Sequence, residues 1–333
     1  MDDLDGALAH DRQSPPILGG SLHRISVVES KSGPRYLIWA MNHAAYDGWS
    51  LGRILETVER FYQEPAFQPN YQLTYGSFIH HVARLRAHDT CQTIANSLGF
   101  WKSYLSGIEQ APLLFNYPQV WDPRQDRLAV FHNLTIPSPI NKELTVPSVI
   151  VASWILLLHQ LSDRSDITIA HLVTGRTVPL PGIETCPGPT ISKVPLRIRL
   201  PELLPKARLS TVAELVRAEA IRVMPHEQSG LDAIRDHVPL QQHAGAILGR
   251  LSLDLTVHLA GHLDFSAGKA LGMELMDLRS TSAARWVLCG VFPEPRRRSG
   301  SFNVAVIWDA RAASDEQINA LVEKFKDILS DRE

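Results

Sequence analysis

Cysteine is scarce in this sequence of 333 residues. Cys91, Cys186 and Cys289 form an odd, widely spaced set without a CxxC pair. Neither a disulfide framework nor a zinc site is therefore indicated, and we expect three reduced thiols in a cytoplasmic protein.

An excess of charge and a long apolar run are also missing. The net charge is −2 at pH 7 and 20% of the residues are charged, which gives no electrostatic argument for binding nucleic acid or an anionic membrane. The best apolar stretch, residues 146–161, is too short to span a bilayer and is interrupted by polar residues. The N-terminus, MDDLDGALAH, is acidic and lacks the features of a signal peptide. We therefore expect partners other than nucleic acid or membrane.

What is present is enough apolar sequence for two lobes. Hydrophobic residues make up 44% of the chain, and its length favours more than one core. Residues 1–20 are polar and contain SPPILGG, which predicts a poorly ordered lead-in. Residues 21–108 are expected to form part of a first lobe, the proline-rich residues 109–127 a crossover, and residues 128–333 a second lobe.

The stretch Met-Asn-His-Ala-Ala-Tyr-Asp-Gly-Trp-Ser, residues 41–50, joins two contrasting patterns. Before it, residues 36–40 read as a strand that follows a first strand at 21–29, with a turn between them. After it, residues 51–61 repeat apolar positions with a helical period. His43 thus lies on a turn between a strand and an amphipathic helix, where it is either a structural histidine or a general base.

A second unusual stretch covers residues 175–199 and reads GRTVPLPGIETCPGPTISKVPLRIR. It is rich in proline and glycine and lies between two strand patterns. Such a composition predicts an extended loop of defined shape rather than a flexible linker.

These two stretches, in this order, resemble nonribosomal peptide synthetase condensation domains. Residues 42–50 resemble the HHxxxDG motif, in the form found in fungal terminal condensation domains that close a peptide ring. Residues 175–197 resemble the segment GR…PGIE…GPxxxxxPLR, which in the family runs across the lobe interface. FWKSYLSG at residues 100–107 and PHEQSGL at residues 225–231 are similar to further family sequences.

The resemblance implies a mixed α/β (α+β) fold similar to chloramphenicol acetyltransferase, with two lobes and the histidine in a tunnel between them. Only 41 residues precede Asn42, and nothing resembles the early RHxxLR region of the family, so we expect an incomplete first lobe. Uncovered sheet edges and apolar surface are the expected consequence.

The resemblance also implies roles for the motif residues. His43 is expected as the catalytic base, and Asn42 stands where the family has its first histidine. Asp47 is expected to be structural, with a buried carboxylate that pairs with Arg176. Gly48 is expected to permit the turn and to offer its amide to the carbonyl or thioester.

Other candidate contacts are more peripheral. His226 is either polar lining of the substrate channel or an organiser of its own turn, and His258 is a candidate lining residue. The triple arginine at 296–298 either meets a carrier-domain surface or phosphate, or is a solvated loop tip.

The expected function is that of an acyltransferase that forms an amide or ester, in an intramolecular, ring-closing form or between two chains. Its substrates would be thioesters on the phosphopantetheine arm of a carrier domain or synthetase acting in trans, and no cofactor is expected to be bound. The alternative is a non-catalytic condensation-domain remnant that acts as an interaction partner of a synthetase. Coenzyme A-dependent plant-type HxxxDG acyltransferases are disfavoured, because DFGWG is absent and PGIE…GP is present.

Overall fold

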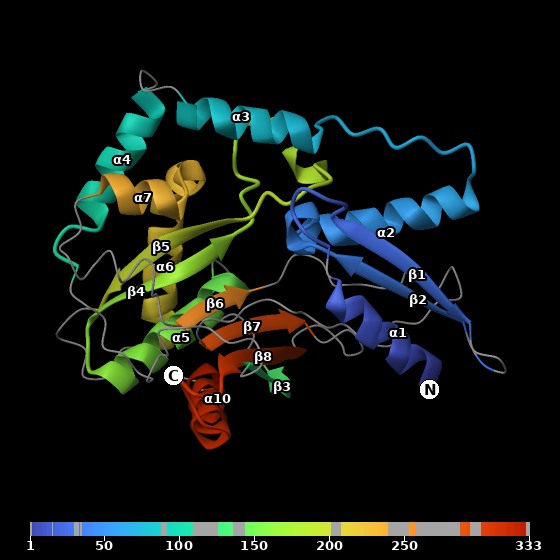
Figure 1. Ribbon diagram of the computed structural model, residues 1–333. Helices are drawn as coiled ribbons and strands as arrows, with labels where there is room; N and C mark the ends of the chain where they lie inside the picture. Colours follow the sequence, from blue (N-terminus) through green and yellow to red (C-terminus); the bar gives the residue numbers. More distant parts are fainter. Residues whose placement is uncertain are drawn as a thin grey trace. The chain divides into compact units, whose positions relative to one another are not determined.

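The computed structural model describes residues 2–14, 16–29, 33, 35–87, 92–108, 126–135, 144–200, 208–238, 253–257, 287–293 and 301–330 (Figure 1). These residues divide into two compact units. The first contains the described residues up to Ile79 together with Pro179–Thr190. The second contains the described residues of His80–Val178 and those from Ile191 onward.

The first unit is built on a β-hairpin. Its strands β1 (His23–Glu29) and β2 (Arg35–Met41) pair antiparallel, with His23 opposite Met41. The unit also contains α1 (Asp2–Gln13), the 3₁₀ turn η1 (His43–Ala45), α2 (Gly48–Gln63), the first turns of α3 (Tyr75–Ala87) and the 3₁₀ turn η3 (Ile183–Thr185). The predicted hairpin and the helix after it are confirmed.

Helix α1 differs from the expected lead-in. Residues 2–13 are helical, and the side chain and backbone carbonyl of Asp11 both accept hydrogen bonds from the Arg24 guanidinium of β1. The Nε–Oδ1 distance is 2.8 Å. This tie to the hairpin is a contact between distant residues, so local composition did not predict it.

The second unit contains a six-stranded sheet in the order β3-β8-β7-β6-β4-β5. Strand β4 pairs parallel with β6 and β6 parallel with β7, whereas the other neighbours are antiparallel. The strands are β3 (Asp126–Thr135), β4 (Asp166–Val173), β5 (Ser192–Arg199), β6 (Leu253–Val257), β7 (Val287–Pro293) and β8 (Ser301–Asp309). The helical elements are α4 (Gln92–Tyr104), α5 (Val146–Ser162), α6 (Leu209–Val223), η4 (Met224–Ser229), α7 (Leu231–His237) and α10 (Asp315–Ser330).

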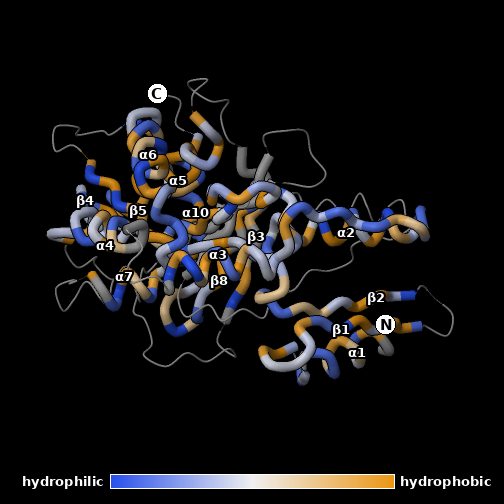
Figure 2. The backbone as a smooth tube through the Cα atoms, turned by 90° about the horizontal axis from the view of Figure 1, so that it is seen from above, coloured by the Kyte–Doolittle hydropathy of each residue, from blue (hydrophilic) through white to orange (hydrophobic). Residues whose placement is uncertain are grey.

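Two apolar clusters stabilise this unit. Successive residues of β4 point to opposite faces of the sheet, and accordingly Ile169 belongs to one cluster and Ala170 to the other. The larger cluster packs α5, α6 and α10 onto the sheet, and the smaller one packs α4 and α7. Helix α5 is buried on nearly all sides and is orange over much of its length in Figure 2. Thr145 caps its start and Asp163, in the left-handed conformation, ends it.

The division of the chain differs from the predicted lobes at two places. Helix α4 lies within the predicted first lobe, but its Trp101 and Tyr104 pack with Ile234 of α7 in the second unit. Residues 179–190 lie within the predicted second lobe, but they belong to the first unit. Tertiary packing decides both assignments, and the proline-rich stretch suggested a boundary elsewhere. Most of that stretch, residues 109–125, lies outside the described part of the chain.

No helix within the described ranges is long and apolar enough to cross a membrane.

Candidate active site

The turn after β2 is held by Asn42. Its backbone N–H donates to the Leu22 carbonyl (2.8 Å), and its side-chain amide donates to the Pro16 carbonyl (2.9 Å). Its side-chain oxygen accepts the Ala44 N–H at 3.0 Å and so caps η1. Asn42 thus connects three segments of the first unit and fixes the backbone immediately before the histidine.

His43 is the first residue of η1 and is exposed. Its imidazole stacks on the Tyr46 ring with centroids 4.6 Å apart and an interplanar angle of 17°. Among the described residues, its ring nitrogens make no hydrogen bond, so they are available to a substrate. Burial raises the pKa of Tyr46, which keeps its phenol neutral beside the imidazole.

Asp47 is only 1% exposed and caps α2. One carboxylate oxygen accepts the Ser50 N–H at 2.7 Å, and the Asp47 N–H donates to the Ser50 hydroxyl at 2.8 Å, which completes a capping box. The other carboxylate oxygen accepts the N–H of Thr190 at 2.9 Å. Backbone amides at a helix start favour a charged carboxylate. The aspartate thus joins the HxxxDG turn to the PGIE…GP segment.

Gly48 is the first residue of α2, and its φ is not among the positive values found for described glycines. The residue before it, Asp47, is the N-cap of α2 and has an extended backbone (φ −126°, ψ 177°). The next residue, Trp49, donates its indole N–H to the Glu184 carbonyl at 2.8 Å. A second bond therefore joins the start of α2 to the same distant segment.

The 179–190 segment needs its glycines where it meets residues 72–75. Gly182 has φ 83°, and a Cβ there would lie 2.7 Å from the Gln72 Cβ. A Cβ on Gly188 would lie 2.3 Å from the Tyr75 ring. The two motifs recognised in the sequence are therefore brought together within the first unit.

Arg176 lies in the second unit, after the end of β4. Its neighbours are held by η4: Gln228 donates its amide to the Gly175 carbonyl at 3.1 Å, and Thr177 donates its hydroxyl to the Glu227 carboxylate at 2.7 Å. Because Asp47 belongs to the first unit, the expected pair of Asp47 with Arg176 stays a prediction.

His226 packs against α4 of its own unit. Its Nδ1 lies 2.8 Å from the Ser97 hydroxyl, and its ring stacks on Phe100 with centroids 4.0 Å apart. Burial lowers its pKa, which favours the neutral imidazole. These contacts favour the turn-organising interpretation of His226. His258 and the arginines at 296–298 lie outside the described residues.

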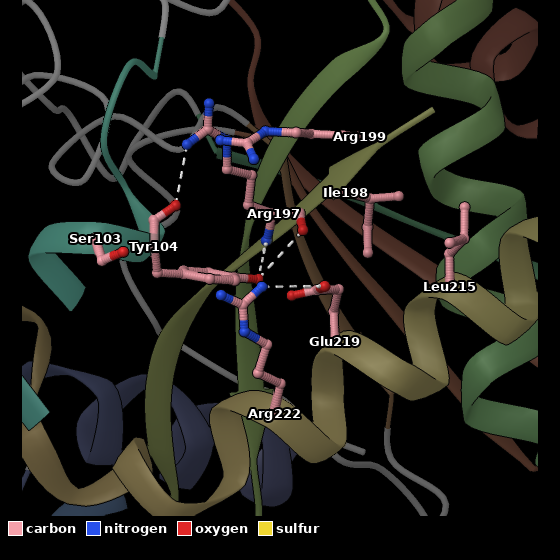
Figure 3. A pocket seen from close by; sticks show the side chains of 8 residues that line it. All are labelled: Ser103, Tyr104, Arg197, Ile198, Arg199, Leu215, Glu219 and Arg222. Carbon is pink, nitrogen blue, oxygen red and sulfur yellow. Dashed lines mark hydrogen bonds and ion pairs between the residues drawn. The ribbon is translucent and has the colours of Figure 1, made fainter. Parts of the chain in front are cut away.

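The second unit also has a cavity of about 230 Å³ between α4, β5 and α6 (Figure 3). The Tyr104 hydroxyl accepts the Arg197 N–H at 2.9 Å, and burial raises the pKa of this phenol. The Arg197 guanidinium bonds Asp166 (Nε–Oδ1 2.8 Å) and the Ser106 carbonyl (2.7 Å). The buried guanidinium is thus satisfied by the protein itself, so this network stabilises the fold.

Three site-related residues were not singled out in the sequence. Thr190 supports Asp47, Tyr46 stacks on His43, and Glu227 holds Thr177. Thr190 and Glu227 lie within the stretches that resemble the family, but the long sequence separations of their contacts hid their partners. Tyr46 lies inside the HxxxDG motif, in one of its variable positions.

Comparison of the sequence with known proteins gives one family. The model of the Condensation domain family matches residues 9–249 of this chain. Apicidin F synthase of Gibberella fujikuroi is 43% identical over 343 residues, covering 98% of this chain and 6% of the synthase. HC-toxin synthetase of Cochliobolus carbonum is 40% identical over 348 residues, covering 99% of this chain and 6% of the synthetase. The chain therefore spans about 6% of the length of these curated relatives.

Solved structures show the same fold. The crystal structure of holo T3CT has a TM-score of 0.78 at 20% identity, and the match covers 99% of this chain and 72% of that one. The first condensation domain of the calcium-dependent antibiotic synthetase, solved with a substrate analogue, has a TM-score of 0.67 at 14% identity and is covered to 71%. The HxxxDG turn, its contact with the PGIE…GP segment and these matches agree: this chain belongs to the condensation-domain family of nonribosomal peptide synthetases.

Proposed function

We propose that this chain catalyses acyl transfer from a carrier-bound peptidyl thioester to an amine or hydroxyl, with His43 as the general base. The observation that carries the proposal is the contrast within the turn. Asn42 and Asp47 on either side of His43 are held by several hydrogen bonds, while the imidazole is exposed and stacked on Tyr46. A fixed backbone with accessible ring nitrogens suits a group that must accept a proton.

In the proposed step, His43 takes the proton of the attacking amine or hydroxyl. The nucleophile bonds to the thioester carbonyl carbon, the C–S bond breaks, and the proton passes to the leaving phosphopantetheine thiolate. An amide or ester and a free thiol result. The amide of Gly48, at the positive end of α2, is our candidate donor to the carbonyl oxygen.

Asp47 and Arg176 serve as supporting residues in this proposal. A buried carboxylate is stabilised by hydrogen bonds and by a cation, and Asp47 already accepts two backbone N–H groups. Arg176 is our candidate for the cation, since η4 bonds the residues on both sides of it.

The relatives suggest the setting of the reaction. Both are named as synthases or synthetases of natural products, apicidin F and HC-toxin. We therefore infer that the partner is a carrier domain of a nonribosomal peptide synthetase, either in the same polypeptide or in trans, and that no cofactor is bound by this chain. Ring closure within one peptide is the form of the reaction that the resemblance in residues 42–50 favours.

The test is a transfer assay with a purified carrier domain loaded with a peptidyl thioester. The nucleophile is offered either as a separate amine or within the same peptide, and mass spectrometry distinguishes a ring from a linear product. Loss of a general base lowers the rate by about 100-fold or more, so His43→Ala is expected to do so. His80→Ala, which removes an exposed histidine of α3, is the matched control and is expected to keep the rate.

An unchanged rate in His43→Ala would contradict the mechanism. An unmodified chain that is folded but yields no product with any carrier tested would instead support the non-catalytic alternative. The exposed apolar side chains of the hairpin, Ile25, Val27 and Leu37, are the observation that favours that alternative, since they suit an interaction surface.

A further inference from the structure

We propose that Glu227 is a positioning residue that holds both ends of the 179–190 segment and thereby orients the turn that carries His43. This inference rests on the proposed function for its catalytic consequence. Its structural part, the hold on the segment, is testable without any activity.

The two ends of the segment meet at this one residue. Thr177, two positions before the segment, donates its hydroxyl to the Glu227 carboxylate at 2.7 Å. Ser192, two positions after it, donates its hydroxyl to the Glu227 backbone carbonyl at 2.6 Å. All three residues belong to the second unit, so both ends of the segment are anchored at a single point of that unit.

The neighbouring residue strengthens this anchor. Gln228 donates its side-chain amide to the carbonyl of Gly175, which has a left-handed φ of 64°. The Gln228 carbonyl in turn accepts the Arg86 Nε–H at 3.2 Å. Turn η4 is thus hydrogen-bonded to Arg86 of α3 and to Gly175, which precedes the segment in the chain.

Glu227 is an unusual residue to bury. It is 5% exposed, and its carboxylate accepts the Thr177 hydroxyl. Burying a carboxyl group costs free energy unless hydrogen bonds compensate, and burial raises the pKa of this group while the Thr177 bond lowers it. A buried glutamate whose carboxylate bonds Thr177 and whose backbone carbonyl bonds Ser192 is placed to order the segment between them.

The segment in turn supports the HxxxDG turn inside the first unit. Thr190 donates its N–H to Asp47, and the Glu184 carbonyl accepts the indole N–H of Trp49. The residues at the base of α2 are therefore hydrogen-bonded, within the first unit, to a segment whose flanking residues Thr177 and Ser192 bond Glu227 within the second unit. Releasing the end at Thr177 is expected to loosen Asp47 and, with it, the position of His43.

The experiment compares pairs of variants that differ in one hydrogen-bonding group. Thr177→Val keeps the side-chain shape but removes the donor, whereas Thr177→Ser keeps it. Glu227→Ala removes the acceptor of the Thr177 bond, whereas Glu227→Gln keeps a side-chain carbonyl oxygen; the Ser192 bond to the backbone carbonyl remains in both. Glu214→Ala, an exposed glutamate of α6, is the matched control.

Hydrogen–deuterium exchange is followed in peptides that cover residues 179–190, and kcat and KM are measured in the carrier-based transfer assay. One hydrogen bond corresponds to a factor of about 2 to 13 in a local equilibrium. We expect Thr177→Val and Glu227→Ala to accelerate exchange of the segment and to lower kcat, each by about that factor, with a smaller change in KM. The serine and glutamine variants are expected to recover most of both effects.

The outcomes separate this inference from the proposed function. Unchanged exchange in Thr177→Val overturns the inference whatever the activity, and that variant decides the question if Glu227→Ala does not fold. Faster exchange with unchanged kcat shows that the segment does not position His43 and also overturns it. A folded but inactive unmodified chain counts against the proposed function, while the exchange data still decide whether Glu227 holds the segment.

Discussion

Single residues in this protein show how burial and hydrogen bonding divide the tasks of a site. Asp47 is buried, and its carboxylate accepts hydrogen bonds from backbone amides. His43, four positions earlier, is exposed. His171 in β4 is a different case. Its Nδ1 is buried without a hydrogen bond among the described residues, and burial lowers its pKa to about 4.

His171 makes stability depend on pH. Its folded-state pKa of about 4 lies below the ordinary value of 6.5, so as the pH falls from 6.5 to 4 the unfolded chain binds a proton that the folded chain does not. The free energy of unfolding should therefore decrease over this window, by at most about 1.4 kcal/mol per pH unit. Urea unfolding between pH 4.5 and 7 measures this. His171→Leu should show a smaller slope against pH, and an equal slope in the two proteins would refute the assignment.

At the scale of elements, the 179–190 segment is a loop of defined conformation rather than a flexible linker. Its Gly182 and Gly188 lie close against residues 72–75, and its Cys186 and Ile183 are buried. Tertiary contacts therefore determine the conformation of this loop.

Two glycine substitutions should have opposite effects. Gly188→Ala places a Cβ 2.3 Å from the Tyr75 ring and should destabilise the first unit by about 1–3 kcal/mol, the usual cost of overpacking. Gly99→Ala, in helix α4 with nothing within 4 Å of its Cβ, should stabilise the protein by up to about 1 kcal/mol. Denaturant unfolding measures both. An unchanged free energy of unfolding in Gly188→Ala would contradict this prediction, because it would show that the Tyr75 ring moves away at little cost.

At the scale of the whole molecule, the described residues of the two units differ in where their apolar side chains lie. The second has two clusters around its sheet. The first exposes Ile25, Val27 and Leu37 on one face of its hairpin, with Val27 and Leu37 directly opposite each other. Its stability is expected to be lower, because hydrophobic burial is the main favourable term in folding.

The units should therefore unfold separately. We expect amides of β1 and β2 to lose protection from hydrogen exchange at a lower urea concentration than amides of α5, because opening free energies follow local burial. Exchange measured across a urea series, with peptides from both units, tests this. One shared transition for both sets of amides would show that the molecule unfolds as a single cooperative body.

The sequence predicted the parts that depend on local pattern. The hairpin follows from alternation and a turn, and α5 from its apolar run, Pro147 near its start and Asp163 at its end. The site motif was recognised because its residues are adjacent in the chain. The Asp47–Thr190 bond, which spans 143 positions, and the bond from Arg24 to Asp11 depend on tertiary contacts that no local pattern encodes. The division of the chain into two units depends on such contacts as well.

The assignment of residues 179–190 to the first unit has a consequence for protein engineering. Among the described residues, the chain passes from one unit to the other between positions 79 and 80, 178 and 179, and 190 and 191. A chimaera made at one splice point would combine an HxxxDG turn from one parent with a supporting segment from another. Exchange of the first unit between relatives should therefore carry residues 179–190 along with it, as a second graft in the same gene.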